Sequence, residues 1–139
     1  MPPSLSDADY AHLLDLRTGL RLFLHWSEEQ AAQVGLTGPQ HQLLLCIRGH
    51  SDPRGPTIGE VAEYLVRRSH TVVSLVDRVE ALGLIERNVD PSDLRLARLV
   101  MTKSGSECLE SLSAAHLEEL SRLGTRMAPL WKGLAPEGG

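Results

Sequence analysis

Leucines recur at helical spacing near the beginning of the chain and again near its end. The first stripe comprises Leu13, Leu16, Leu20 and Leu24. Three-to-four spacing of this kind predicts a long amphipathic helix over residues 9–33. The second stripe comprises Leu109, Leu112, Leu117, Leu120, Leu123, Met127 and Leu130. It predicts one or two helices after Ser104, which forms a capping-box pattern with Glu107.

Start signals between the two stripes predict shorter helices. Thr37-Gly38-Pro39 is a helix start, because proline is favoured in a first turn, and a helix is expected over residues 40–49. Residues 50–56 have the composition of a loop. Thr57 and Glu60 then form a capping box that starts another short helix.

A further helix is expected after a break at Val66-Arg67-Arg68. Ser69 is a suitable N-cap for it, and Gly83 would end it after about Leu82. Two strand-like runs follow, over residues 84–87 and 96–101, and the residues between them are turn formers. The pattern therefore predicts a β-hairpin with its turn over residues 88–95.

The order of four helices, a hairpin and a final helical region indicates a fold class that is mainly α with a small β-hairpin wing. Two short helices followed at once by a hairpin are typical of the winged helix-turn-helix, whose second helix enters the major groove of DNA. This fold class also sets which residues would face DNA.

The second helix of that pair has two distinct faces. Its inward face would carry Val72, Leu75, Val76, Val79 and Leu82. Thr71, Ser74 and Arg78 fall on the outward face, with His70 beside them in the first turn. Hydroxyl, imidazole and guanidinium groups are the types that read base edges, although a solvated polar face would have the same pattern. Arg67 and Arg68 precede the helix and are candidate phosphate contacts.

Composition and charge leave this interpretation open. The 139 residues are enough for one domain, with 42% hydrophobic and 23% charged residues. The net charge of -4 is unusual for a DNA-binding protein, but residues 67–103 contain seven basic and five acidic residues and so carry +2. The chain lacks a signal-peptide pattern and a membrane-length apolar run, so a cytoplasmic location with no membrane partner is expected.

Three segments resemble the multiple-antibiotic-resistance regulator (MarR) family of bacterial transcription factors. They are residues 57–62, residues 69–73 and residues 76–87. The hairpin is similar to the wing pattern of that family in the order Asp93-x-Arg95-x-x-x-Leu99-x-Met101-Thr102. Many relatives carry two consecutive arginines after the aspartate, whereas this chain has Leu94 and Arg95.

The resemblance implies a homodimer that binds double-stranded DNA. Its N- and C-terminal dimerisation helices would form one lobe, over about 9–33 and 103–134, of a single domain 1–139, and the DNA-binding lobe would span about 36–102. Arg95 would reach the minor groove, held by a salt bridge from Asp93. The DNA-binding set is then Arg67, Arg68, Ser69, His70, Thr71, Ser74, Arg78, Asp93 and Arg95. The implied function is a repressor on a pseudo-palindromic operator, released by a small-molecule effector.

The resemblance also implies a pocket for a small aromatic or anionic effector. The candidates are Arg17, Arg21, His25, Trp26 and His41. Arg17, Arg21 and His25 lie one turn apart, so one face could meet an anion, or it could be a solvated charged edge. Redox sensing by Cys46 or Cys108 has no cationic neighbour to support it, and the scattered histidines predict no metal site and no cofactor.

Two other classes of function compete with a DNA-binding regulator. The acidic overall charge leaves open a winged-helix protein-interaction module without direct DNA binding. An enzyme is not expected, because the sequence contains no nucleophile elbow, phosphate loop or recognisable carboxylate pair.

Overall fold

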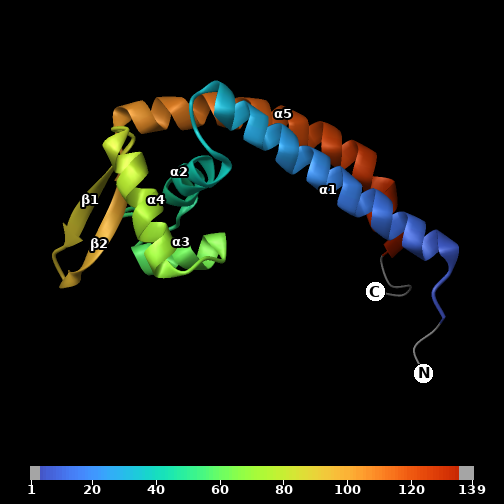
Figure 1. The fold of residues 1–139 in the computed structure, drawn as a ribbon, viewed down its shortest axis with the longest axis horizontal. Helices are drawn as coiled ribbons and strands as arrows, with labels where there is room; N and C mark the ends of the chain where they lie inside the picture. Colours follow the sequence, from blue (N-terminus) through green and yellow to red (C-terminus); the bar gives the residue numbers. More distant parts are fainter. Residues whose placement is uncertain (1–3, 135–139) are drawn as a thin grey trace. The chain divides into compact units, whose positions relative to one another are not determined.

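The computed structural model describes residues 4–134 as helices joined to one antiparallel hairpin (Figure 1). The elements are α1 (Asp7–Gln33), α2 (Gly38–Gly49), α3 (Ile58–Leu65), α4 (Ser69–Ala81), β1 (Ile85–Asp90), β2 (Asp93–Met101) and α5 (Lys103–Leu134). They form two compact units, one made of residues 4–30 and 114–134, the other of Ala31–Ser113. The expectation of a mainly helical fold with a small wing is confirmed. Over residues 4–134 no helix is long and apolar enough to cross a membrane.

The first unit consists of two helical segments that run antiparallel. Gly19 of α1 lies opposite Met127 of α5, and the Ser27 hydroxyl lies 2.6 Å from His116 Nε2. Leu123 and Met127 are buried here. Many other apolar side chains of this unit remain exposed, including Leu13, Leu20, Leu24, Leu117 and Leu120. The two leucine stripes are therefore only partly covered within one copy of the chain.

The second unit has a hydrophobic core between its helices and the hairpin. Its largest fully buried side chains are Leu43, Leu44, Ile85, Leu99, Val61, Val72, Val76, Val79 and Pro56. Helices α2, α3 and α4 contact one another, and α4 also packs on β1. The buried positions on α4 are spaced by three and four residues, so one side of this helix is fixed to the core and the other side faces outward.

Local side-chain hydrogen bonds explain where most helices begin. Thr57 and Glu60 form the predicted capping box, with distances of 3.2 Å and 3.1 Å, and Thr37 forms a second box with Gln40. Two predicted caps are wrong. Ser69 is the first residue inside α4, where Arg68 is the N-cap without a side-chain bond, and α5 begins at Lys103, where the Thr102 hydroxyl accepts from the Gly105 amide at 3.1 Å.

The hairpin is longer than the turn-forming residues predicted. Its register pairs Ile85 with Met101 and Val89 with Ala97, and an irregularity follows Val89. Residues 88–90 and 93–95 are therefore strand, and only residues 91 and 92 separate the strands. Cross-strand hydrogen bonds thus extend past residues whose local preference is for turns. The Leu99 amide also donates to the Pro56 carbonyl at 2.9 Å, and Thr57 bridges Arg98, so the loop before α3 lies beside β2.

Candidate nucleic-acid interface

The outward side of α4 presents a continuous polar surface, which we call the recognition face: His70, Thr71, Ser74 and Arg78. All four side chains are exposed, while Val72, Val76 and Val79 on the opposite side are buried. Leu82, expected to point inward, is 54% exposed because it lies at the C-cap, beyond the last turn of the helix. The remaining predicted faces agree with the structure.

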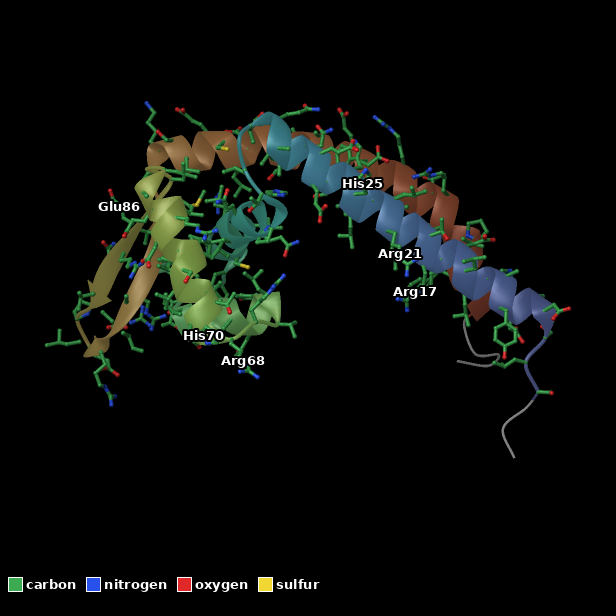
Figure 2. The ribbon with its side chains drawn as sticks, in the orientation of Figure 1. Arg17, Arg21, His25, Arg68, His70 and Glu86 are labelled. Carbon is green, nitrogen blue, oxygen red and sulfur yellow. The ribbon has the colours of Figure 1, made fainter. Side chains whose placement is uncertain are left out.

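Two arginines stand where the chain enters α4. Arg67 and Arg68 are exposed in the turn between α3 and α4. Figure 2 shows Arg68 and His70 together at the end where α4 begins. Neither arginine, nor Arg78, forms an ion pair with any residue in the range 4–134. These guanidinium groups, two of them beside the positive end of a helix, can therefore meet an anion without first breaking a salt bridge.

A groove of about 510 Å³ runs along the recognition face. Its lining includes Arg67 and Arg78, together with Thr37, Gln40 and Gln42 from α2. The sequence predicts no DNA-contacting residue on α2, where its one candidate was His41 for the effector pocket. The Thr37–Gln40 capping box was readable from the sequence, but its position beside α4 was not.

The tip of the wing carries a further exposed cation. The Arg95 guanidinium donates from Nε to Asp93 Oδ1 at 3.0 Å and from Nη2 to Asp93 Oδ2 at 2.9 Å. This ion pair is the one that the family resemblance implied. The Arg95 side chain remains 89% exposed, so Asp93 orients the guanidinium without covering it. The pKa of Asp93 lies below its usual value, chiefly because the Arg95 side chain donates to it.

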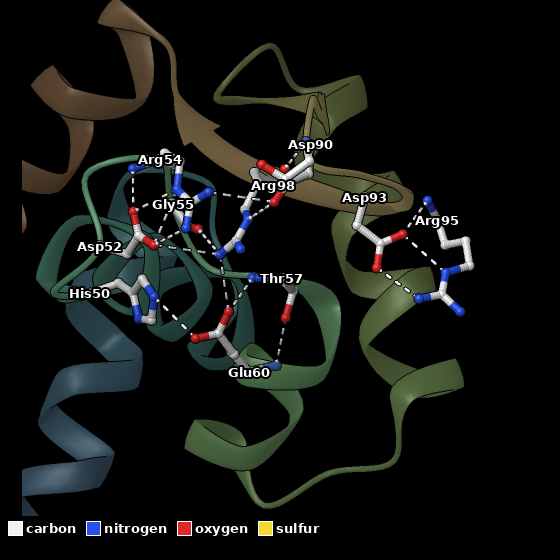
Figure 3. A network of polar contacts seen from close by, with 11 residues as sticks. His50, Asp52, Arg54, Gly55, Thr57, Glu60, Asp90, Asp93, Arg95 and Arg98 are labelled. Carbon is white, nitrogen blue, oxygen red and sulfur yellow. Dashed lines mark hydrogen bonds and ion pairs between the residues drawn. The ribbon is translucent and has the colours of Figure 1, made fainter.

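Two other basic residues of the wing form ion pairs within the protein. Arg87 pairs with Asp77 and lies 3.6 Å from Glu80, both on α4. Arg98 pairs with Asp90 at 3.0 Å and has a side chain only 13% exposed (Figure 3). The net charge counted from the sequence thus includes two arginines that do not face solvent as free cations.

The five effector candidates have different surroundings. Arg17 and Arg21 are exposed on α1, as is His25, which pairs with Glu29 at 2.8 Å (Figure 2). Trp26 is half-buried, with its ring 4.8 Å from that of His116 and 6.0 Å from that of Phe23. His41 belongs to the other unit and is buried on α2.

The cysteines lie at the edge of the core of the second unit. Cys46 and Cys108 are free and half-buried. Burial raises the pKa of both thiols above the usual value, which disfavours the reactive thiolate. Both residues therefore behave as small apolar side chains in this structure.

Sequence comparisons find similarity to transcription regulators. The family model described as "MarR family" matches residues 34–96. The HTH-type transcriptional regulator YsmB of Bacillus subtilis is 26% identical over 113 residues, covering 78% of this chain and 75% of YsmB. The residues that the family model matches include α2, α3, α4 and most of the hairpin.

Solved structures with the same fold cover almost the whole chain. MepR, a regulator of the Staphylococcus aureus multidrug efflux pump MepA, superposes with a TM-score of 0.70 at 24% identity, over 84% of this chain and 83% of its own. AbsC from Streptomyces coelicolor gives 0.71 at 20% identity, over 95% and 97%. The MepR–DNA complex gives 0.64 at 22% identity, over 88% and 85%. These proteins are transcription regulators, and over residues 34–96 this chain is similar to the family described as MarR.

Proposed function

We propose that this protein binds a specific DNA sequence as a homodimer and represses transcription from it. The observation that carries the proposal is the recognition face, whose four polar side chains are exposed on a helix anchored by buried valines. A helix of this kind fits the major groove and offers hydrogen-bonding groups to base edges. Arg67 and Arg68 stand beside it and would contact phosphates.

The wing supplies the second contact with DNA in this proposal. Arg95 is oriented by Asp93 and extends into solvent from the tip of the hairpin. An arginine presented in this way suits the narrow minor groove, where the negative potential is strongest. MepR, which is similar in fold to this chain, has been solved as a DNA complex, and this adds support.

The apolar surface of the first unit supports dimerisation. Leucines on α1 and on the second half of α5 are exposed in one copy of the chain. Exposed apolar patches of this kind mark surfaces that are covered by a partner, and a second copy is the partner that a palindromic operator requires. The two recognition helices would then contact two half-sites.

An effector that releases DNA is part of the same proposal. Arg17 and Arg21 are exposed cations one turn apart on α1, without an ion partner among residues 4–134. Benzoate is a suitable probe, with acetate as control, and binding can be followed by calorimetry. Benzoate should bind the wild type and lower its DNA affinity, and Arg17→Gln with Arg21→Gln should abolish both effects. Unchanged binding by the double variant would remove these residues from the effector site.

DNA binding itself is tested with the duplex upstream of the protein's own gene. We expect preference over random duplex and an affinity that falls steeply with salt. His70→Ala and Ser74→Ala should relax the preference at individual base pairs, while Val73→Ala, an exposed position beside them, serves as the matched control. A stable complex with a partner protein and no DNA shift would instead favour the interaction-module alternative.

A further inference from the structure

Charged side chains gather where the wing meets the rest of the second unit. We call this group the wing-root cluster: His50, Asp52, Arg54, Glu60, Asp90 and Arg98 (Figure 3). They come from the loop before α3, from α3 itself and from the two strands. Arg98 lies at the centre, because its guanidinium contacts all three of these regions.

The contacts of Arg98 are specific to each region. Nε donates to Asp90 Oδ2 in β1 at 3.0 Å. Nη1 donates to the Gly55 carbonyl in the loop at 3.2 Å and to Glu60 Oε1 in α3 at 3.4 Å. A guanidinium can do this because its N–H groups point in several fixed directions in one plane, whereas an ammonium group has no such fork.

Asp90 depends on this arrangement. Its side chain is 3% exposed, and it accepts from the Ser92 amide at 2.7 Å as well as from Arg98. The pKa of Asp90 is lowered first by the Ser92 amide and then by Arg98, so the carboxylate is charged in the folded protein. A buried charge that loses its partner is strongly unfavourable, and Arg54 Nη1, at 3.8 Å, is a distant substitute.

The backbone is joined at the same place. The Leu99 amide donates to the Pro56 carbonyl at 2.9 Å, and Arg98 bridges Thr57. Beyond this point the hairpin extends toward Arg95, three residues or about 10 Å along the strand. A change in the angle of the strand at Arg98 is therefore magnified at the tip.

We propose that Arg98 is a positioning residue for DNA recognition, which fixes the wing against the loop and α3 and so sets where Arg95 meets DNA. It does not itself contact DNA, since its guanidinium is enclosed by the cluster. The inference rests on the proposed DNA-binding function. It adds that this one enclosed guanidinium holds the distance between the major-groove and minor-groove contacts.

The test is a double-mutant cycle in the full chain on the upstream duplex. Arg98→Met should lower affinity about tenfold, comparable with losing a minor-groove arginine. It should add almost nothing in an Arg95→Ala background but its full effect in an Arg78→Ala background. Arg98→Lys, which keeps the charge without the fork, should restore affinity only in part. Arg48→Met, at an exposed arginine of α2, is the matched control and should leave affinity unchanged.

Equal losses in both backgrounds would overturn the proposal, because a general loss of folded protein does not depend on Arg95. If the methionine variant does not fold, the lysine variant is put through the same cycle. Amide hydrogen exchange without DNA separates this proposal from the DNA-binding function. In both variants, exchange should become faster in the wing and stay unchanged in α4. If exchange in the wing is also unchanged, the positioning role is overturned, even if the wild type binds no DNA.

Discussion

The recognition face and the wing-root cluster use similar residue types in opposite ways. Arg78 on the recognition face is exposed and has no ion partner within residues 4–134, whereas Arg98 in the cluster is enclosed by three carboxylates. An exposed guanidinium loses little free energy when phosphate replaces the water around it. An enclosed and paired guanidinium fixes the geometry of the fold, and it would have to give up its ion pairs to contact DNA.

Arg95 is intermediate between these two cases. It has an ion partner, as Arg98 does, but the partner lies two residues away in the same strand and leaves the guanidinium in solvent. A local pair of this kind orients the side chain and does not tie two segments together. Whether an arginine is available to contact DNA or instead holds two segments together thus depends on how far away its partners are in the chain.

The largest loss of stability is expected at Gly55, where the loop backbone lies closest to strand β2. Gly55 has a φ of +91°, and a Cβ there would lie 1.9 Å from the Leu99 carbonyl oxygen. Gly55→Ala should lower the free energy of unfolding by about 3 kcal/mol, through backbone strain and displacement of β2. Urea denaturation followed by circular dichroism measures this change.

Gly35→Ala is the matched control for that substitution. Gly35 has a similar φ of +79°, but no atom lies within 4 Å of its added Cβ. Only the conformational strain remains, about 1 kcal/mol. Equal losses for the two variants would mean that the contact between the loop and the wing contributes nothing.

Arg95→Ala should separate recognition from folding. Because the side chain is exposed, the free energy of unfolding should change by less than about 0.5 kcal/mol. DNA affinity should fall about tenfold or more, as expected for one base-groove arginine. Fluorescence anisotropy on the upstream duplex measures it, and an unchanged affinity would exclude the wing tip from the interface.

Acid should weaken the wing root through carboxylates whose pKa values lie below the usual range. The Arg54 side chain is the main cause for Asp52, and hydrogen bonding and nearby cations act on Asp90 and Glu60. A lowered folded pKa gives stability that is present above the unfolded value of about 4 and is lost as the pH falls through the folded value.

The free energy of unfolding should therefore fall between about pH 5 and pH 2. Arg54→Gln should flatten this dependence, because it removes the largest cause of the shift at Asp52. Arg48→Gln, on exposed α2 surface, should leave the slope as in the wild type. Urea midpoints measured at several pH values decide between these outcomes.

The cations beside the recognition helix predict a change in salt dependence. Arg67→Gln should reduce the slope of log affinity against log salt by about 1, since one phosphate contact is lost. Arg87→Gln is the matched control, because Arg87 is held by Asp77 and Glu80. If both substitutions change the slope equally, ion pairing within the protein does not decide which arginines meet phosphates.

The smallest expected effect is a gain in stability, at the turn before α4. Val66 is 90% exposed and has a φ of 52°, a left-handed conformation that a β-branched residue adopts at a cost. Val66→Asn should raise the free energy of unfolding by about 0.5 to 1 kcal/mol. Val89→Asn, at an exposed strand position, should give no such gain, and a loss at Val66 would show that its side chain contributes contacts of its own.

Local interactions made much of the fold predictable. The Thr57–Glu60 capping box, the helix over residues 69–81 and the separation of its two faces all depend on residues three or four apart. The exposed positions of His70, Thr71, Ser74 and Arg78 followed from that periodicity alone. Their role in DNA binding stays a prediction until binding is measured.

Predictions failed where distant partners outweighed local preference. Ser69 and Ser104 have the residue types of N-caps, but the position of the last non-helical residue depends on how the chain approaches the helix. At the start of α5 it is Thr102, and not Ser104, whose hydroxyl accepts from a backbone amide of the first turn. Asn88 and Asp93 looked like turn residues, but cross-strand pairing extended both strands through them.

The sequence by itself determined the helices, the recognition face and the resemblance to the MarR family, because each depends on patterns that extend over a few residues. Only the tertiary structure gave Arg98 a role. The wing pattern singled out Arg95 and left Arg98, three residues further along the same strand, unmarked, yet Arg98 meets Gly55 and Glu60 from segments about forty residues away. The free energy of a charged side chain is set by burial and by partners in space, and these exist only once the loop, α3 and the wing have come together.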